Sequence, residues 1–196
     1  MFKYEDKLVE LPNKGRLLVV ADLHGRYDYY SEFLELWGSK NDYIVFLGDL
    51  IHSVSSNDGS IELLDDVIEK SQKYSNFIPL LGNHELTHIL DKDVFKGGIN
   101  QKIGFELLIS KKKNYLEPYL SNYVKFFKSM PFFVTTANGL FLSHAGPSEN
   151  YEDIFKIDNY SNKVLNDFLW NRYGDYNEFT IKAFLKYMGL NYMKNT

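Results

Sequence analysis

The chain has 196 residues, a formal net charge of −4 and no cysteine. This length predicts one domain, and 44% hydrophobic residues with only 5 prolines exclude a disordered or low-complexity chain. The acidic balance disfavours nucleic-acid polymers as partners, and the missing cysteines exclude disulfides, thiolate metal ligands and a cysteine nucleophile. Since no apolar run approaches ~18 residues, no membrane partner is expected and a cytoplasmic location is predicted.

The first half of the chain alternates between strand and helix patterns. Three apolar runs have the length of buried strands, at residues 16–20, 42–47 and 76–81. Between them, apolar residues at helical spacing predict crossover helices at 27–37 and 61–74. This alternation indicates an α/β fold.

Each predicted strand ends in a short polar cluster. The clusters read Ala21-Asp-Leu-His-Gly25, Gly48-Asp49 and Gly82-Asn-His-Glu85. Ligands of α/β sheets bind beyond the carboxyl ends of the strands, so these clusters are expected to share one site. Pro79 lies inside the third run and predicts an edge position or a bulge there.

The second half is less regular. Residues 95–129 are predicted to be helical, and the runs 132–136 and 140–142 flank Asn138-Gly139, a strong hairpin signal. The hairpin leads into a fourth polar cluster, Ser143-His-Ala-Gly146. Further helices are predicted at 161–170 and 180–188, the latter stopped by Gly189.

The polar clusters contain the ligand types of a metal site. Asp22 and His24 are two residues apart, so both side chains project the same way if the strand geometry continues. Adding Asp49, Asn83 and His144 gives carboxylate, imidazole and amide donors without sulfur. Such a set suits two divalent ions, Mn, Fe or Zn, with one carboxylate as the bridge. Two ions about 3.5–4 Å apart stabilise the attacking and leaving oxygens of a phosphoryl displacement.

The four clusters, in this order, resemble the motif series of calcineurin-like metallophosphoesterases, and the hairpin cluster is closest to the serine/threonine protein phosphatase branch. The resemblance covers residues 16–147. It implies an α/β fold, a mixed β-sandwich flanked by helices, as one domain over residues 1–196. It also implies two divalent ions, Mn first among them, and roles for the site residues: Asp22 and His24 on the first metal, Asp49 bridging, Asn83 and His144 on the second, and His84 as general acid.

The C-terminal part resembles the family and then departs from it. Residues 168–172 are similar to the Trp-containing segment that supplies a phosphate-binding arginine, here Arg172. Residues 183–192 are similar to the helix and strand that lead to a further metal-binding histidine. The chain ends Met193-Lys-Asn-Thr196 instead, so this domain is expected to be incomplete there unless another group takes over the role.

A second departure concerns His52 and Ser53, where the protein phosphatases have an aspartate and an arginine. The aspartate normally orients the acid histidine, and His52 either pairs with His84 in its place or is an ordinary polar loop residue. His88 lies one helical turn beyond His84 and is predicted on a solvated helix face. The basic run 111–113 is predicted in a solvated loop.

The resemblance implies hydrolysis of phosphomonoesters by metal-bound hydroxide, without a covalent enzyme intermediate. The leading hypothesis is a phosphoserine or phosphothreonine protein phosphatase. One alternative is a dinucleoside polyphosphate hydrolase, so the predicted partner is a phosphoprotein or a nucleotide. The other is a catalytically weak phosphate-binding module that lacks the last metal ligand.

Overall fold

The computed structural model describes residues 2–38, 41–53 and 57–190. The chain forms two compact units, one of residues 15–130 and one that joins residues 1–14 to residues 131–196. Each unit is described by itself, and the prediction of a single domain stays a prediction. Residues 191–196, where the missing metal-binding histidine was noted, lie outside the described residues. None of the described helices combines the length and the apolar character needed to cross a membrane.

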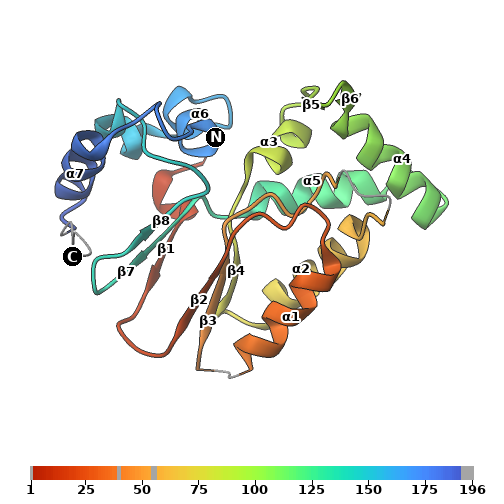
Figure 1. The fold of residues 1–196 in the computed structure, drawn as a ribbon, viewed down its shortest axis with the longest axis horizontal. Coiled ribbons are helices and arrows are strands. Elements are labelled where there is room, and N and C mark those ends of the chain that lie inside the picture. Colours follow the sequence, from red (N-terminus) through yellow and green to blue (C-terminus); the bar gives the residue numbers. More distant parts are fainter. Residues whose placement is uncertain (1, 39–40, 54–56, 191–196) are drawn as a thin grey trace. The chain divides into compact units, whose positions relative to one another are not determined.

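Unit 15–130 contains a parallel sheet with the helices of the unit to one side of it (Figure 1). Its strands are β2 (Leu17–Val20), β3 (Tyr43–Phe46) and β4 (Phe77–Pro79), in the spatial order β2-β3-β4. All three predicted strands are thereby confirmed. Pro79 cannot donate a ladder hydrogen bond, and β4 is indeed an edge strand.

The predicted crossover helices are confirmed as α1 (Tyr27–Trp37) and α2 (Ser60–Lys73). They lie next to each other beside the sheet (Figure 1), and α2 also contacts β4. The face of α2 turned inward carries fully buried apolar side chains, Leu63, Leu64 and Val67, at helical spacing. Helix α2 therefore covers part of the sheet whose strand ends carry the polar clusters.

The predicted helix over 95–129 is wrong in its first part and in its continuity. A small hairpin, β5 (Phe95–Lys96) and β6 (Ile99–Asn100), turns through Gly97 and Gly98, which both have positive φ. Asn100 then caps α4 (Gln101–Lys113) by accepting a hydrogen bond from the amide of Ile103. After a break, α5 (Tyr119–Ser129) follows Pro118, which occupies its N-cap.

The basic run 111–113 is the last turn of α4 and not a loop, so that prediction is also wrong. Lys112 and Lys113 form ion pairs with Glu62 and Asp65 on α2. Cations at a helix C-terminus also compensate the partial negative charge of the free carbonyl groups. The run therefore joins two helices of this unit.

The second unit contains a mixed sheet of β1 (Leu8–Leu11), β7 (Phe133–Thr136) and β8 (Phe141–Leu142). The antiparallel pair of β7 and β8 confirms the predicted hairpin, whose turn uses Gly139 at φ +92°. Strand β1, which pairs in parallel with β7, was not predicted from the sequence.

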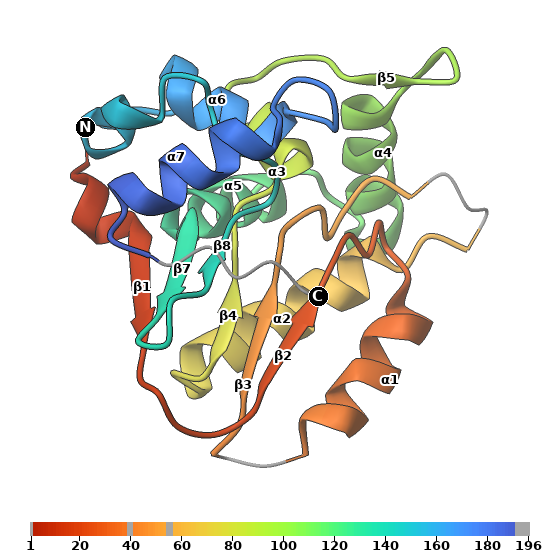
Figure 2. The same cartoon turned by 60° about the vertical axis from the view of Figure 1, so that its left-hand side comes forward.

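Helices α6 (Lys163–Trp170) and α7 (Glu178–Tyr187) confirm the last two predicted helices, and both face the sheet of their own unit (Figure 2). Two short 3₁₀ helices, at Tyr4–Lys7 and Tyr151–Lys156, complete the unit. Its core is a set of edge-on and tilted rings, with centroids 4.9–5.4 Å apart, contributed by Phe133, Phe141, Phe168 and Phe184.

Candidate metal centre

The loops after β2 and β3 are joined by main-chain hydrogen bonds. The amides of Leu23 and His24 donate to the carbonyl oxygen of Asp49, at 3.1 and 2.8 Å. His24 and Asp49 both have positive φ, +45° and +52°, which is uncommon for residues other than glycine. The hydrogen bonds across the loops hold these two side chains in fixed positions at the strand ends.

The loop after β4 joins the same site by a close glycine contact. Gly48 has φ +100°, and a Cβ atom on it would lie 2.5 Å from the Cα atom of Gly82. Only glycine allows both the backbone conformation and the approach. Gly82 immediately precedes α3 (Asn83–Ile89), so this contact brings the first residues of α3 to Asp49.

A fully buried carboxylate, that of Glu85, fastens the loops together. Its Oε2 accepts hydrogen bonds from the amides of Gly82 and Asp49, both at 3.0 Å, and its Oε1 accepts from the amide of Leu50 at 2.8 Å. Glu85 was not predicted as a site residue from the sequence. The available signal was an acidic residue three positions after the N-cap of a helix, which is half of a capping box.

The position of the proton on His24 follows from its hydrogen bond. Its Nδ1 lies 3.1 Å from the carbonyl oxygen of Ile51, which only accepts hydrogen bonds. Nδ1 therefore carries the hydrogen and Nε2 offers its lone pair. That Nε2 lies 3.9 Å from carboxylate oxygens of both Asp22 and Asp49. A backbone partner of this kind is typical of metal-binding histidines.

Asp49 completes a donor set that fits a divalent ion. Its Oδ1 accepts a hydrogen bond from the amide of His84 at 3.0 Å, while its Oδ2 lies 3.8 Å from His84 Nε2 and 3.9 Å from His24 Nε2. Ligand atoms of His24, Asp49 and His84 all lie within 4.8 Å of one another. Mixed imidazole and carboxylate donors suit Mn, Fe or Zn. Asn83, fully buried, is the first residue of α3.

The family of the chain follows from comparison with known proteins. The family model of calcineurin-like phosphoesterases matches residues 15–195. The chain belongs to this family. Its members are metal-dependent, and the side chains around Asp49 could hold a metal ion. The family and the α/β metallophosphoesterase fold predicted from the sequence are confirmed.

Similar proteins include phosphatases of more than one kind. Over 181 residues the chain is 24% identical to a Caenorhabditis elegans serine/threonine-protein phosphatase, covering 87% of this chain and 37% of that one. A protein serine/threonine phosphatase from Saccharomyces cerevisiae superposes with a TM-score of 0.65 at 21% identity, covering 86% of this chain and 53% of its own. A mutant cold-active protein tyrosine phosphatase superposes with a TM-score of 0.59 at 15% identity, covering 95% and 67%. The chain therefore spans about a third to a half of the length of the first two relatives.

The pairing of His52 with His84 is confirmed. His52 Nδ1 lies 2.6 Å from His84 Nδ1, and its other ring nitrogen, Nε2, lies 2.8 Å from His88 Nε2. The prediction that His88 is solvated is wrong, because its side chain is 6% exposed and packs against Phe105 of α4 and Phe127 of α5. Burial lowers the pKa of His88 to about 4 and, with the neighbouring imidazoles, that of His52 to about 2.

His144 and Arg172 belong to the other compact unit. His144 is half-buried in the loop after β8. Arg172 is exposed directly after α6, and its main-chain amide donates to the Asp175 carboxylate at 2.7 Å. Their predicted roles, as a ligand of the second metal and as a phosphate-binding side chain, stay predictions.

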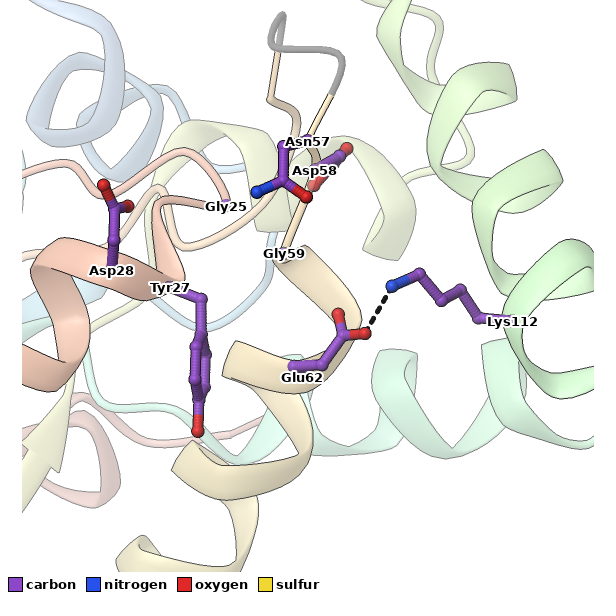
Figure 3. A pocket seen from close by; sticks show the side chains of 8 residues that line it. All are labelled: Gly25, Tyr27, Asp28, Asn57, Asp58, Gly59, Glu62 and Lys112. Carbon is purple, nitrogen blue, oxygen red and sulfur yellow. Dashed lines mark hydrogen bonds and ion pairs between the residues drawn. The ribbon is translucent and has the colours of Figure 1, made fainter.

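A pocket of ≈ 270 Å³ opens next to the loop that carries His24 (Figure 3). Its wall carries three carboxylates, of Asp28, Asp58 and Glu62, and one cation, Lys112, which is paired with Glu62. Two of these carboxylates are paired, Asp28 with Arg26 and Glu62 with Lys112.

Proposed function

We propose that this chain is a metal-dependent phosphoesterase that hydrolyses phosphomonoesters, with phosphoserine or phosphothreonine side chains as its substrates. The observation that carries the proposal is the approach of His24 Nε2 to carboxylate oxygens of Asp22 and Asp49, at 3.9 Å from each, with the ring of His84 beside them. Two divalent ions bound there, with Mn²⁺ as the first candidate, would neutralise phosphoryl charge and stabilise the attacking and leaving oxygens.

The residues of this site divide into ligands and donors. Asp22 and His24 would hold the first ion, Asp49 would hold both, and Asn83 would bind the second. His84 Nε2 faces the same point and would donate its hydrogen to the leaving oxygen. Arg172 has the planar fork that matches two phosphate oxygens.

Substrate choice rests on the likeness to the serine/threonine phosphatase relatives. The relative found by sequence is named a serine/threonine-protein phosphatase, which supports a phosphoprotein substrate. The family match and the Asp and His side chains gathered at the strand ends support metal-dependent phosphoester hydrolysis.

The test is metal content together with Mn²⁺-dependent hydrolysis. Turnover would be measured on a phosphoserine peptide, an aryl phosphate and a diadenosine polyphosphate, with Asp49→Asn as the inactive control. Faster turnover of the phosphopeptide than of the dinucleotide supports the proposal, and the reverse order replaces the protein substrate by a nucleotide. Tight binding of the phosphopeptide without metal-dependent turnover would show a phosphate-binding module instead.

A further inference from the structure

Strand β2 has one side without a partner strand. It is an outer strand of the sheet β2-β3-β4 and pairs only with β3 among the described residues (Figure 2). The carbonyl oxygens of Arg16 and Val20 accept hydrogen bonds from the β3 side, at 2.7 and 2.8 Å. Successive residues of a strand direct their main-chain groups to opposite sides, so Leu17 and Val19 direct theirs away from β3. The amides and carbonyl groups of these two residues therefore face the free edge of the sheet.

This edge lacks the features that usually keep sheet edges from pairing. Residues Leu17–Val20 include no charged residue and no proline, and their register with β3 is continuous, without a bulge. Natural edge strands are commonly blunted by such features, because an open apolar edge is a template for another strand. The opposite edge of the same sheet, β4, does contain a proline, Pro79. On the β2 edge, by contrast, Val19 is 39% exposed and nothing in the strand opposes pairing.

An apolar hollow lies beside this edge. A cavity of ≈ 240 Å³ opens between the start of β2 and the last turn of α1. Leu36, at the end of α1, is 63% exposed, although it belongs to the wall of this cavity. The wall consists of Arg16, Leu17, Leu18, Leu36, Trp37 and Asp42. Apolar side chains that arrive here with another strand are removed from water, which favours association.

We infer that the β2 edge is a self-association surface, on which β2 of a second copy of this chain pairs in antiparallel orientation. A two-fold axis at Leu18 places Leu17 of each copy opposite Val19 of the other. Each of these two pairs exchanges two hydrogen bonds between main-chain groups that face the edge. The two sheets then continue as one, and the contact is the same surface on both copies, as a two-fold dimer requires.

The small size of the edge favours a second copy over a flexible peptide. Strand β2 has four residues, of which only Leu17 and Val19 direct main-chain groups outward, so an added strand gains few hydrogen bonds. A flexible peptide would lose conformational entropy for these few bonds, whereas β2 of a second copy is already held in place by its own β3. The second copy also brings its own Leu18 next to Leu18, beside the apolar cavity.

The antiparallel orientation separates the functional ends of the two copies. The candidate ligands Asp22 and His24 follow the carboxyl end of β2, and the carboxyl ends of two antiparallel strands point in opposite directions. The candidate metal centres therefore lie at opposite ends of the joined sheet. The association does not depend on the proposed function, and its test needs no turnover.

Sedimentation velocity of the full chain, at concentrations from about 5 to about 500 µM, measures the association. We expect the wild type to shift from monomer toward dimer over this range. Val19→Pro removes an N–H that faces the edge and leaves the hydrogen bonds with β3, whereas the matched control Val19→Thr keeps that N–H. The dissociation constant of the dimer should rise about 10-fold or more in Val19→Pro and stay near the wild-type value in Val19→Thr. Leu107→Lys, at a 64% exposed position of α4, should leave it unchanged.

Single introduced cysteines test the register, because the chain has no cysteine of its own. Facing residues of a non-hydrogen-bonded antiparallel pair have Cα atoms about 4.5 Å apart, which a disulfide can span. Leu18→Cys should therefore form a covalent dimer under mild oxidation. In Val19→Cys the two cysteines are offset by two residues along the strands, beyond the limit of about 7 Å for a disulfide, and should stay reduced.

A wild type that remains monomeric at about 500 µM would overturn the inference. Dimerisation of Val19→Pro equal to that of Val19→Thr would do the same, and so would a loss of the dimer in Leu107→Lys, which would place the contact on α4. Thermal unfolding shows whether each variant folds. If Val19→Pro does not fold, the cysteine variants decide: cross-linking of Leu18→Cys alone supports the inference, and any other pattern contradicts it.

Discussion

Replacing Glu85 by glutamine tests whether one buried carboxylate holds the strand ends together. In Glu85→Gln, the amide oxygen can take the place of Oε2 and keep the hydrogen bonds from the Gly82 and Asp49 amides. The amide nitrogen then faces the Leu50 N–H, which loses its acceptor. A lost charge-assisted hydrogen bond contributes about 1.5–3 kcal/mol, and an unsatisfied buried N–H costs about 1–3 kcal/mol. The expected loss is therefore about 2.5–6 kcal/mol of the free energy of unfolding.

Urea unfolding of the metal-free chain measures this loss directly. The matched control is Glu62→Gln, which removes the same charge from a half-exposed ion pair with Lys112. Exposed pairs of this kind contribute under about 1 kcal/mol, so the control should stay close to the wild type. If Glu85→Gln costs no more than the control, the carboxylate does not fasten the loops and the account of the strand ends is refuted.

Three further predictions concern the loop after β3 and helix α3. Asp49→Asn is expected to weaken the binding of both metal ions, since Asp49 is proposed to bridge them; retention of two ions per chain, measured by elemental analysis, contradicts the bridge. Gly48→Ala is expected to lower the free energy of unfolding by about 1–3 kcal/mol, because its φ of +100° and the nearby Gly82 backbone exclude a side chain; a melting temperature equal to that of the wild type disproves this. His88→Gln is expected to flatten the fall of stability with acid. The pKa of His88 is about 4 in the folded chain, below its usual value of 6.5. Above about pH 6.5 His88 is neutral in both states, whereas between pH 6.5 and 4 the unfolded chain takes up a proton that the folded chain does not, so the free energy of unfolding falls. Unfolding at pH 7, 5.5 and 4 measures this fall, and parallel curves for wild type and variant would contradict the prediction.

Much of the fold was predictable from local patterns. The strands β2, β3 and β4 are uninterrupted apolar runs that end in polar residues, and α1 and α2 carry regular apolar stripes. By contrast, the charged residue Glu10 interrupts the apolar run of β1, and its partner β7 lies far away in the sequence. The segment 95–129 was misassigned because Gly97-Gly98 and Pro118, both signals of a chain break, were outweighed by the helical spacing around them.

The site residues that lie in the strand-end motifs could be predicted from the sequence. The burial of residues beside them could not, because it depends on tertiary packing. Asp22, His24, Asp49 and His84 come together as their motif order predicts. The burial of His88, however, depends on side chains of α4 and α5 that no local pattern connects to α3. Helical spacing places a residue on a face but does not say what covers that face.

The pairing of Leu8 with Phe133 has a consequence for how the protein is made. On the ribosome, β1 is synthesised before residues 15–130 but has no partner strand until β7 has been synthesised, whereas residues 15–130 form a continuous unit with the strands β2, β3 and β4. Domains fold as units during synthesis, and pairings between distant segments form late because closing a long loop is entropically costly. The loops after β2, β3 and β4, which carry the candidate metal ligands, are thus complete before β1 can pair with β7, and that pairing is a late folding step.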